Sequence, residues 1–500
     1  MVVHTNSKEA VEARNAVMEF LLINHPLDCP ICDEAGECKL QEYAYNYSIG
    51  ESRFDEMKTY KDKRVELGPN VMFDQERCIS CSRCIRFCEE IAKEPQLTFV
   101  NRGEHVTIET FPGKKLDNPY SMNVIEICPV GALTSRDFRF KARVWDMSHT
   151  DSICTGCSRG CNMNIWVRDN QIYRLTPREN MEVNQYWMCD YGRLNTFKYI
   201  NDKETRVNSP MMRPTEEGIL NDEKNGLINV DWDDAIARVI SEFKKYRPEE
   251  IGFIASPFTT LEDNFVLKRF AEEVIGAEAG IEDDSNICCI PKMVDGDEDD
   301  LLIRADKSPN SNGLKYLGIQ VITNKFTERI LRKQLKLIYI INDSVGRLSN
   351  AAELMKTIET GITHITNFDE TSKKATVIFP STTYAEMNGT LVNFQGRIQR
   401  IRPAVATLEV ERLPDEFSVS RLDKFGAQND RWTQGMKFNA RPVWKVLNQI
   451  AKAMGHDFGY DNTEEVFDDI SRKIPAFEGL DYEAIGGQGV LLSDIKAVKV

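Results

Sequence analysis

The stretch CISCSRCIRFC, residues 78–88, places four cysteines in the order Cys78-x2-Cys81-x2-Cys84-x3-Cys88. This tight spacing lets three thiolates of one loop bind three irons of a [4Fe–4S] cubane, while the fourth ligand comes from elsewhere in the chain. In two-cluster ferredoxins the fourth cysteine of such a run serves the other cluster and is followed by proline. Here Glu89 follows Cys88 instead. The stretch therefore predicts a ferredoxin-like cluster domain with a distal ligand.

The distal ligand is predicted to be Cys128, because the Cys-Pro pair of this sequence is Cys128-Pro129. We assign one cluster to a set of four cysteines, called the second set: Cys78, Cys81, Cys84 and Cys128. Cys88 is then expected to be a buried thiol that behaves as a small hydrophobe.

Cysteine is concentrated in the first part of the chain. Twelve of the fourteen cysteines lie between Cys29 and Cys189, and the other two are the adjacent pair Cys288-Cys289. A disulfide-rich secreted protein is short and carries an export signal, whereas no basic stretch leading into an apolar segment follows Met1. The clustered thiols are therefore predicted to be metal ligands in a chain that is not exported.

Composition excludes several classes of protein. The 500 residues are 41% hydrophobic and 28% charged, which suffices for cores in about two to four domains. The formal charge of −15 argues against general binding of nucleic acid or of an anionic membrane, which needs a basic face. The longest apolar run, Leu337–Ile341, is far shorter than the ~20 residues of a membrane-spanning helix, so no direct membrane insertion is expected.

A further group of candidate ligands follows an expected helix over residues 7–23, which Ser7 caps and Pro26 stops. The group, called the first set, has the spacing His-x3-Cys-x2-Cys-x5-Cys and consists of His25, Cys29, Cys32 and Cys38. One imidazole and three thiolates complete four-coordination around zinc as well as the four corners of a cubane. Taken alone, the first set favours neither kind of centre.

The third set of candidate ligands has the spacing Cys-x2-Cys-x3-Cys-x27-Cys and consists of Cys154, Cys157, Cys161 and Cys189. Gly156 and Gly160 lie inside the loop, where a backbone close to sulfide needs small residues. Residues 164–167 and 171–175 are expected to form two short strands around a turn. A zinc ribbon is the rival interpretation, but ribbons favour paired C-x2-C knuckles and here the last cysteine stands alone.

Three sets of four ligands in one chain favour an electron relay, in which each cubane passes one electron to a neighbour. This organisation also favours a cluster for the first set. The non-redox alternative is a zinc-stabilised scaffold, which predicts a colourless protein with about three zinc ions.

The remainder of the chain is predicted to be an α/β doubly wound domain. Residues 251–255, 337–341 and 375–379 are apolar runs typical of buried parallel strands. Thr259 or Thr260 is expected to cap a helix that Gly276 ends. No G-x-G-x-x-G or Walker motif occurs, so neither an NADH nor a flavin site is expected.

Two conspicuous features of this remainder have ordinary explanations. The acidic run Asp295–Asp300 lacks the glycine and glutamate that a calcium-binding loop requires, so a solvated loop is expected. Cys288 and Cys289 have no histidine or third cysteine near them in the sequence, which favours two buried thiols.

With these ligands in view, the sequence resembles the large iron–sulfur subunit of respiratory NADH:quinone oxidoreductase (complex I), in the molybdopterin-oxidoreductase superfamily. The resemblance rests on the three ligand sets and on the stretches VDWDDA, residues 230–235, and GTLVNFQGR, residues 389–397. It implies an α+β iron–sulfur region followed by an α/β domain. The expected domains are a one-histidine, three-cysteine domain over residues 1–60 and a ferredoxin-like domain over residues 61–147. They are followed by a small β cluster domain over residues 148–205 and a molybdopterin-oxidoreductase-like domain without catalytic metal over residues 206–500.

The resemblance implies an electron-transfer subunit of an oxidoreductase, with three [4Fe–4S] clusters and no catalytic residue on this chain. The implied partners are the flavoprotein and quinone-module subunits of the peripheral arm. The implied location is the bacterial cytoplasm, on the cytoplasmic face of the inner membrane as part of a complex. In the family, the third set of ligands occurs only in some bacterial members, where the cluster lies off the main electron route.

Two departures from the family pattern carry expectations. The usual N-terminal [2Fe–2S] domain does not precede the first set, which is expected to mean either a separate ferredoxin-like chain or a start placed downstream of the true one. Tyr191 stands where molybdenum and tungsten enzymes often have lysine, two residues after the last cluster cysteine. Molybdopterin is therefore not expected. The alternative function is a catalytic, formate-dehydrogenase-like subunit in which Cys288 or Cys289 binds the metal.

Overall fold

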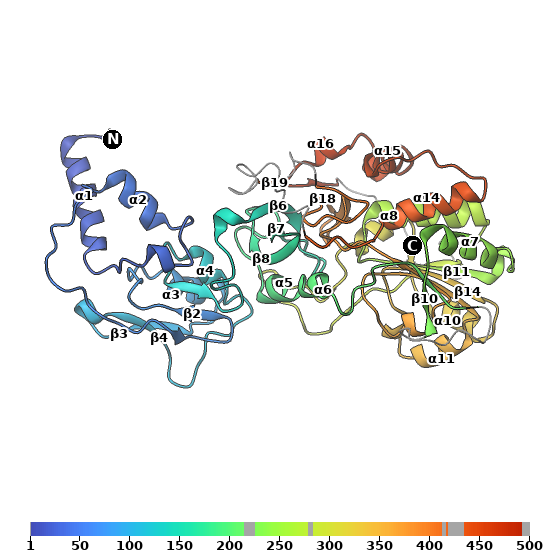
Figure 1. The fold of residues 1–500 in the computed structure, drawn as a ribbon, viewed down its shortest axis with the longest axis horizontal. Coiled ribbons are helices and arrows are strands. Elements are labelled where there is room, and N and C mark those ends of the chain that lie inside the picture. The colour runs from blue at the N-terminus through green and yellow to red at the C-terminus, as the bar shows by residue number, and fades with distance from the viewer. Residues whose placement is uncertain (1, 215–225, 279–283, 413–416, 419–434, 493–500) are drawn as a thin grey trace. The chain divides into compact units, whose positions relative to one another are not determined.

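The computed structural model describes residues 2–214, 226–278, 284–412, 417–418 and 435–492. The chain divides into two compact units (Figure 1). The first unit contains Met1–Ser148 and Trp187–Arg193, and the second contains His149–Tyr186, Leu194–Ser418 and the described residues after 434. The first and second sets of candidate ligands therefore lie in the first unit.

The first unit begins with two helices. Helix α1 (Lys8–Leu22) starts where the sequence predicted, because the Ser7 hydroxyl accepts a hydrogen bond of 3.3 Å from the Ala10 backbone N–H. A short 3-10 turn, η1 (Cys29–Ile31), separates α1 from α2 (Lys39–Tyr47). The helices thus bracket the loop that carries the first set.

Short strands form the framework of the rest of the first unit. Strands β1 (Val65–Glu66), β2 (Val71–Phe73) and β5 (Leu133–Ser135) form an antiparallel sheet in the order β1-β2-β5, and β3 (Leu97–Val100) pairs with β4 (Thr107–Thr110). Phe73 on β2 is opposite Leu133 on β5. This pairing brings the turn after Cys128 beside the segment that leads into Cys78.

Further short helical segments belong to the first unit, and three of them carry or precede candidate ligands. They are α3 (Arg83–Arg86), the π-helical turn η2 (Phe87–Ile91) and α4 (Asn123–Ile127). Cys84 lies in α3 and Cys88 in η2, and Cys128 is the residue that ends α4.

A small antiparallel sheet opens the second unit, in the order β19-β6-β7-β8. Its strands are β6 (Ser148–Ile153), β7 (Asn162–Arg168), β8 (Gln171–Pro177) and β19 (Phe417–Ser418). The two strands predicted around residues 168–170 are confirmed, and both are longer than predicted. The turn between them is tight because Asp169 and Asn170 have φ angles of 52° and 57°, a region that these two residue types tolerate.

The largest element of the second unit is an eight-stranded sheet, which confirms the predicted α/β fold. Its order is β10-β9-β16-β15-β14-β11-β12-β13, with strands β9 (Met211–Met212), β10 (Ile228–Asn229), β11 (Ile251–Ala255), β12 (Ile287–Cys289), β13 (Gln320–Val321), β14 (Leu337–Ile341), β15 (Thr360–Ile365) and β16 (Val377–Pro380). Strands β11 to β16 run parallel, and β9 and β10 pair antiparallel at one edge. The predicted strand over residues 375–379 begins two residues later than expected.

Helices cover both faces of this sheet (Figure 1). One face packs against α7 (Trp232–Phe243), α8 (Leu261–Arg269) and α14 (Val443–Ala453). The other packs against α10 (Asn324–Leu331) and α11 (Ala351–Thr357). Thr260 caps α8, and Gly276, with a φ of 76°, ends the π-helical continuation η7 (Phe270–Ile275). Both predicted boundaries of this helical segment are confirmed.

Further strands and helices belong to the second unit. Strands β17 (Gly389–Val392), β18 (Arg397–Ile401) and β20 (Val490–Leu491) form a separate sheet. Helices α9 (Ser311–Tyr316), α15 (Thr463–Lys473) and α16 (Tyr482–Ile485) also belong to this unit.

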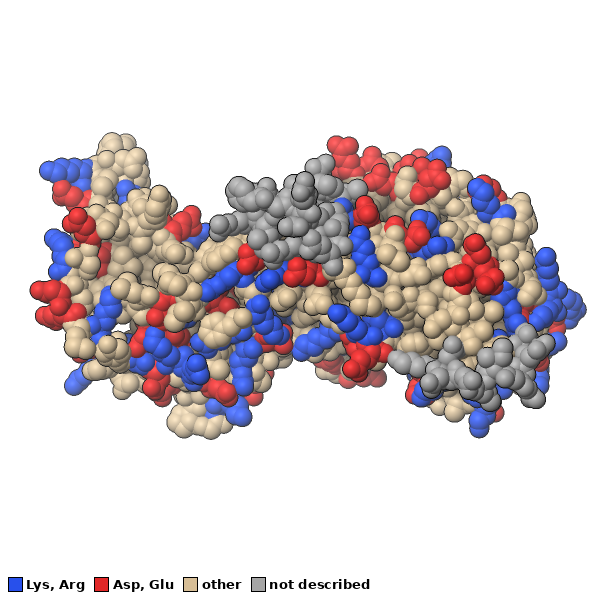
Figure 2. Space-filling model, viewed as in Figure 1, with Lys and Arg blue, Asp and Glu red and all other residues tan. Residues whose placement is uncertain are grey.

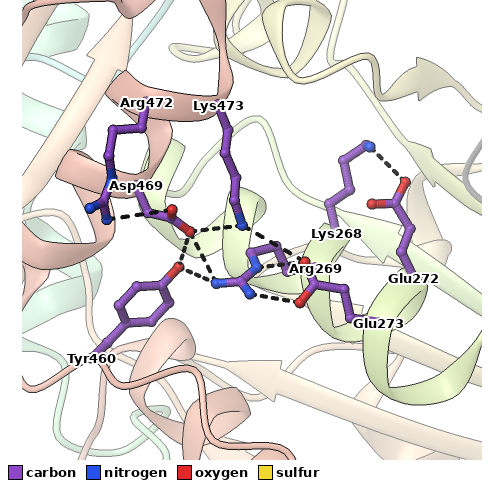
Figure 3. Close-up of polar contacts among 8 residues, drawn as sticks. All are labelled: Lys268, Arg269, Glu272, Glu273, Tyr460, Asp469, Arg472 and Lys473. Carbon is purple, nitrogen blue, oxygen red and sulfur yellow. Dashed lines mark hydrogen bonds and ion pairs between the residues drawn. The ribbon is translucent and has the colours of Figure 1, made fainter.

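A charged network fastens helix α15 to helix α8 and its continuation (Figure 3). Arg269 pairs with Glu273 through Nε and Nη2, at 2.8 and 2.6 Å. Its Nη1 lies 3.0 Å from Asp469 Oδ2 of α15, and the Tyr460 hydroxyl donates to the same oxygen at 2.6 Å. Lys473 Nζ completes the network at 3.0 Å from Asp469.

Charged side chains of both signs are intermixed over the face shown in Figure 2. Within the described residues, no helix is both long enough and apolar enough to span a membrane.

Candidate metal centres

The four cysteines of the second set line one small cavity. Apolar side chains, including Phe73, Ile108 and Leu133, form much of the remaining wall. Each of these three side chains is buried. The cavity therefore combines four sulfur donors with a mainly apolar lining, and one of the donors, Cys81, is exposed to solvent.

Local backbone geometry directs three of these thiols toward the cavity. Ser80 and Ser82 adopt φ angles of 53° and 63°, so the chain turns sharply between successive cysteines. The Ser80 backbone N–H donates to Cys78 Sγ at 3.4 Å. Such N–H groups stabilise a thiolate, because they bring partial positive charge to the sulfur.

Cys128 reaches the same cavity from the other side. The Asp74 backbone N–H donates to the Ala132 carbonyl at 2.8 Å, which holds the turn after Cys128 against the end of β2. Burial raises the pKa of the Cys128 thiol to about 12, and burial also raises the pKa of Cys84. Buried thiols of this kind ionise at neutral pH only when a metal supplies compensating positive charge.

Cys88 has a different environment, although it is only four residues from Cys84. It is fully buried in η2, and burial raises its pKa to about 12. Its thiol is hydrogen-bonded to the Asn118 side chain. It is not among the residues that line the cavity of the second set.

The cysteines of the first set follow helix α1 closely. Cys29 is exposed at the start of η1, Cys32 is buried, and Cys38 is half-buried at the N-terminus of α2. Cys38 Sγ accepts the Gln41 backbone N–H at 3.4 Å. Burial raises the pKa of both Cys32 and Cys38.

His25 leaves α1 as predicted, with its backbone N–H donating to Leu22 O at 3.2 Å. Lys58 Nζ closes the helix end by donating to the carbonyls of Leu22 and Ile23 at 2.9 and 2.7 Å. Burial, together with the nearby charges of Arg77 and Lys58, lowers the pKa of His25 to about 4. The imidazole is therefore neutral at pH 7, which is the form that binds a metal.

The first and second sets share a wall at the turn after Cys128. A Cβ added to Gly131 would lie 2.3 Å from Cys32 Sγ and 2.9 Å from Glu34 Cβ, so only glycine fits there without displacing Cys32. Cys38 Sγ lies 3.9 Å from the Pro129 carbonyl oxygen. The turn that carries one ligand of the second set thus touches two ligands of the first.

Three cysteines of the third set lie in the second unit, between β6 and β7. The Cys154 backbone N–H donates to Cys161 O at 2.8 Å, and the Gly156 N–H donates to Cys154 Sγ at 3.4 Å. Gly160 has a φ of 67° and lies against Gln399, where a Cβ would be 2.7 Å from Oε1. Cys189 belongs to the first unit, where the Gly192 N–H donates to its Sγ at 3.3 Å.

All fourteen cysteines are free thiols. Among the residues that the structure describes, no three His, Cys, Asp or Glu side chains form a group that could hold a single metal ion. A cubane makes a different demand, because each thiolate binds a different iron.

Cys288 and Cys289 occupy the end of β12 and are both buried. Burial raises the pKa of Cys289 to about 12 and that of Cys288 well above its ordinary value. The buried environment agrees with the interpretation of this pair as two ordinary buried thiols.

Sequence reasoning missed two residues that shape these sites. Gly131 follows a predicted ligand by three positions, but no sequence signal shows that its missing Cβ accommodates Cys32. Arg77 directly precedes Cys78, yet its guanidinium is buried and bonded to Asp28, beside Cys29. Both contacts join segments far apart in the chain, which spacing rules do not address.

Four protein-family models match successive parts of the chain. Residues 14–53 match the NADH-ubiquinone oxidoreductase-G iron-sulfur binding region, and residues 68–134 match the ferredoxin-like domain of NADH-quinone oxidoreductase subunit 3. Residues 147–201 match the molybdopterin oxidoreductase Fe4S4 domain, and residues 206–305 and 314–411 match molybdopterin oxidoreductase.

Curated relatives include the G subunit of NADH-quinone oxidoreductase from Rickettsia bellii, which is 41% identical over 276 residues, 55% of this chain and 38% of that protein. The mitochondrial NADH dehydrogenase (ubiquinone) iron-sulfur protein 1 of Solanum tuberosum is 40% identical over 54% of this chain and 35% of its own length. The mitochondrial NADH-ubiquinone oxidoreductase 78 kDa subunit of Neurospora crassa is 38% identical over 56% of this chain and 36% of its own length. The matched segment thus spans well under half of each relative.

Among solved structures, an NAD+-reducing [NiFe]-hydrogenase in the H2-reduced state is similar to 28% of this chain and 60% of that chain, with 27% sequence identity and a TM-score of 0.25.

Proposed function

This chain belongs to the family of large iron–sulfur subunits of NADH-quinone oxidoreductases, and we propose that it relays electrons through iron–sulfur clusters inside a complex of that kind. The electrons originate from NADH by way of a flavin-containing partner and pass toward quinone. Iron–sulfur clusters, when bound, supply one-electron carriers. The chain itself makes and breaks no substrate bond in this role.

The observation that carries the proposal is the cavity of the second set. Four cysteines from two distant segments, residues 78–84 and residue 128, line one mainly apolar space in the first unit. Four thiols with no disulfide among them match the ligand requirement of a [4Fe–4S] cluster.

We propose three [4Fe–4S] clusters, one for each set of ligands. The proposed iron ligands are His25, Cys29, Cys32 and Cys38 for the first cluster, Cys78, Cys81, Cys84 and Cys128 for the second, and Cys154, Cys157, Cys161 and Cys189 for the third. The family matches over residues 14–53, 68–134 and 147–201 support iron–sulfur binding in each region. For the third cluster, the assignment rests on sequence spacing and on the family match alone.

The chain's own residues hold the clusters and shape their surroundings. Apolar side chains line much of the second set's cavity, and backbone N–H groups donate to sulfur in all three sets, as at Cys38, Cys78 and Cys154. Hydrogen bonds to sulfur, nearby charge and burial are the means by which a protein sets the potential of a cluster. The neutral His25 makes the first cluster less negative by one charge than an all-cysteine cluster.

The proposed partners are the flavoprotein and quinone-module subunits of the complex. The proposed location is the cytoplasmic face of a bacterial inner membrane, where the chain is bound to partners rather than inserted. The α/β domain that follows residue 205 acts as a structural support in this proposal, without a molybdopterin.

Anaerobic purification of the chain tests the proposal directly. The expected product is brown and contains roughly twelve irons per chain, four for each cubane. A colourless protein with about three zinc ions would contradict the relay and support a scaffold. Stoichiometric molybdenum or tungsten would instead support the catalytic, formate-dehydrogenase-like alternative.

A further inference from the structure

We propose that Arg77 sets the reduction potential of the first cluster, by placing a buried positive charge and one uncommitted N–H donor group beside the ligands of the first set. The inference rests on the proposed function, since it concerns a cluster assigned there. Arg77 is not a proposed iron ligand, and in the sequence it directly precedes Cys78 of the second set rather than a ligand of the first set.

Arg77 is a buried arginine with two acidic partners. The residue is 3% exposed. Its Nη2 and Nε lie 3.0 and 3.3 Å from Asp28 Oδ2, and Nε lies 3.2 Å from Asp74 Oδ2. Lys63 Nζ joins the same group at 2.6 Å from Asp28. A guanidinium removed from water needs such partners, because an unpaired buried charge strongly destabilises the fold.

The third nitrogen of the guanidinium takes no part in these contacts. Nη1 of Arg77 is buried and has no hydrogen-bond partner among the described residues. This buried donor group can therefore take an acceptor that the protein chain does not supply. The sulfide and thiolate sulfurs of an iron–sulfur cluster are acceptors of this kind.

The location of this charge follows from its partner. Arg77 directly precedes Cys78 of the second set, but Asp28 directly precedes Cys29 of the first set. The two Arg77–Asp28 hydrogen bonds therefore tie the guanidinium to the residue that precedes Cys29.

A cation in this position changes the potential in a definite direction. Reduction adds one electron, and hence one negative charge, to the cluster and changes no covalent bond. Arg77 stabilises the more negative form and raises the potential, whereas Asp28 and Asp74 act in the opposite sense. The other cations facing Arg77 are Lys63, bonded to Asp28, and Arg139, whose pKa the Arg77 charge helps to lower.

The test is a redox titration of the whole chain, purified anaerobically with its clusters and followed by EPR. Signals are assigned beforehand by their loss in Cys29→Ala and Cys81→Ala variants. Arg77→Met is expected to make the first cluster harder to reduce by about tenfold, which is about 59 mV for a one-electron couple. The potential of the second cluster is expected to shift less.

Two variants separate charge from packing. Arg77→Lys keeps the charge and is expected to restore most of the potential. Arg136→Met makes the same chemical change in the first unit at a residue that bonds Glu66 and the Gly68 carbonyl, away from the ligand loops, and is expected to leave both potentials unchanged. An Arg136→Met shift equal to that of Arg77→Met would overturn the inference.

Asp74→Asn covers the case in which Arg77→Met does not fold. It removes a negative charge 3.2 Å from Arg77 Nε and leaves the two Arg77–Asp28 hydrogen bonds in place, so it is expected to raise the potential of the first cluster, opposite in sign to Arg77→Met. An unchanged or lowered potential in Asp74→Asn, or loss of the first signal instead of a shift in a folded Arg77→Met, would refute a role in setting the potential. Absence of cluster signals from the unmodified chain would overturn the proposed function itself, and the inference with it.

Discussion

Among the single residues of this protein, Gly131 shows how closely the first and second sets are joined. Its α-carbon faces Cys32 Sγ, while the preceding residue, Val130, lines the cavity of the second set. Two adjacent residues of one turn thus contact different sets of ligands.

This geometry predicts that substitutions at the adjacent residues Val130 and Gly131 affect different clusters. Gly131→Ala is expected to remove or distort the EPR signal of the first cluster, because the added methyl group overlaps Cys32, and such overpacking typically destabilises by about 1–3 kcal/mol. Val130→Ala is expected to affect the second cluster instead. Gly361→Ala is a control, since its added Cβ would meet its nearest neighbour at an ordinary 3.7 Å. Equal effects of Gly131→Ala and Val130→Ala on both signals would contradict the shared wall.

The choice between Cys128 and Cys88 gives a second prediction for single residues. Cys128→Ala is expected to remove the EPR signal of the second cluster and about four irons per chain, because Cys128 lines the cavity. Cys88→Ala truncates a buried thiol outside that cavity and is expected to keep both. Iron analysis of the two purified variants measures the difference, and the reverse result would exchange the roles of the two cysteines.

Among the larger elements, the network around Arg269 holds α15 against α8 (Figure 3). Asp469 receives hydrogen bonds from Arg269 and Tyr460 and an ion pair from Lys473. Despite burial, these partners lower the pKa of Asp469, and Arg269 lowers the pKa of Glu273. The network thus stabilises the second unit only while both carboxylates are ionised.

Asp469→Asn is therefore expected to lower the free energy of unfolding of the second unit by about 1–3 kcal/mol at pH 7. The pKa of Asp469 is lower in the folded than in the unfolded chain, so its stabilisation is complete above the unfolded pKa of about 3.9 and is lost as pH falls through the folded pKa. Thermal unfolding measured from pH 7 to pH 3 should show a smaller loss of stability in the variant. Glu272→Gln, in the partly exposed pair with Lys268, is a control expected to change stability by less than about 1 kcal/mol. An identical pH profile in Asp469→Asn and the unmodified chain would contradict this role.

The two units of the chain differ in their candidate ligands and in their architecture. The first unit is built from short strands and helical turns, and it contains the first and second sets complete. The second unit buries its core between helices and an eight-stranded sheet, with Cys288 and Cys289 as ordinary buried thiols at the end of β12. This division fits the proposed electron relay, in which the first unit would hold two of the clusters.

Features that depend on neighbouring residues could be predicted from the sequence. Ser7 and Thr260 cap helices as predicted, Gly276 ends η7, and the apolar runs at 251–255 and 337–341 form β11 and β14 with the predicted bounds. Ligand spacing likewise selected the candidate thiols, three of which, with the distal Cys128, line one cavity. These features are local, since caps, strand faces and loop reach depend on a few consecutive residues.

Contacts between distant segments, in contrast, depend on the tertiary structure. The pairing of Phe73 with Leu133 brings Cys128 to the cavity of Cys78, Cys81 and Cys84, and packing of the same turn places Gly131 against Cys32. Likewise, Arg77 adjoins the second set in sequence but bonds Asp28 of the first ligand loop. Spacing along the chain limits how far a residue can reach, whereas the packing of the whole unit selects the partner that it contacts.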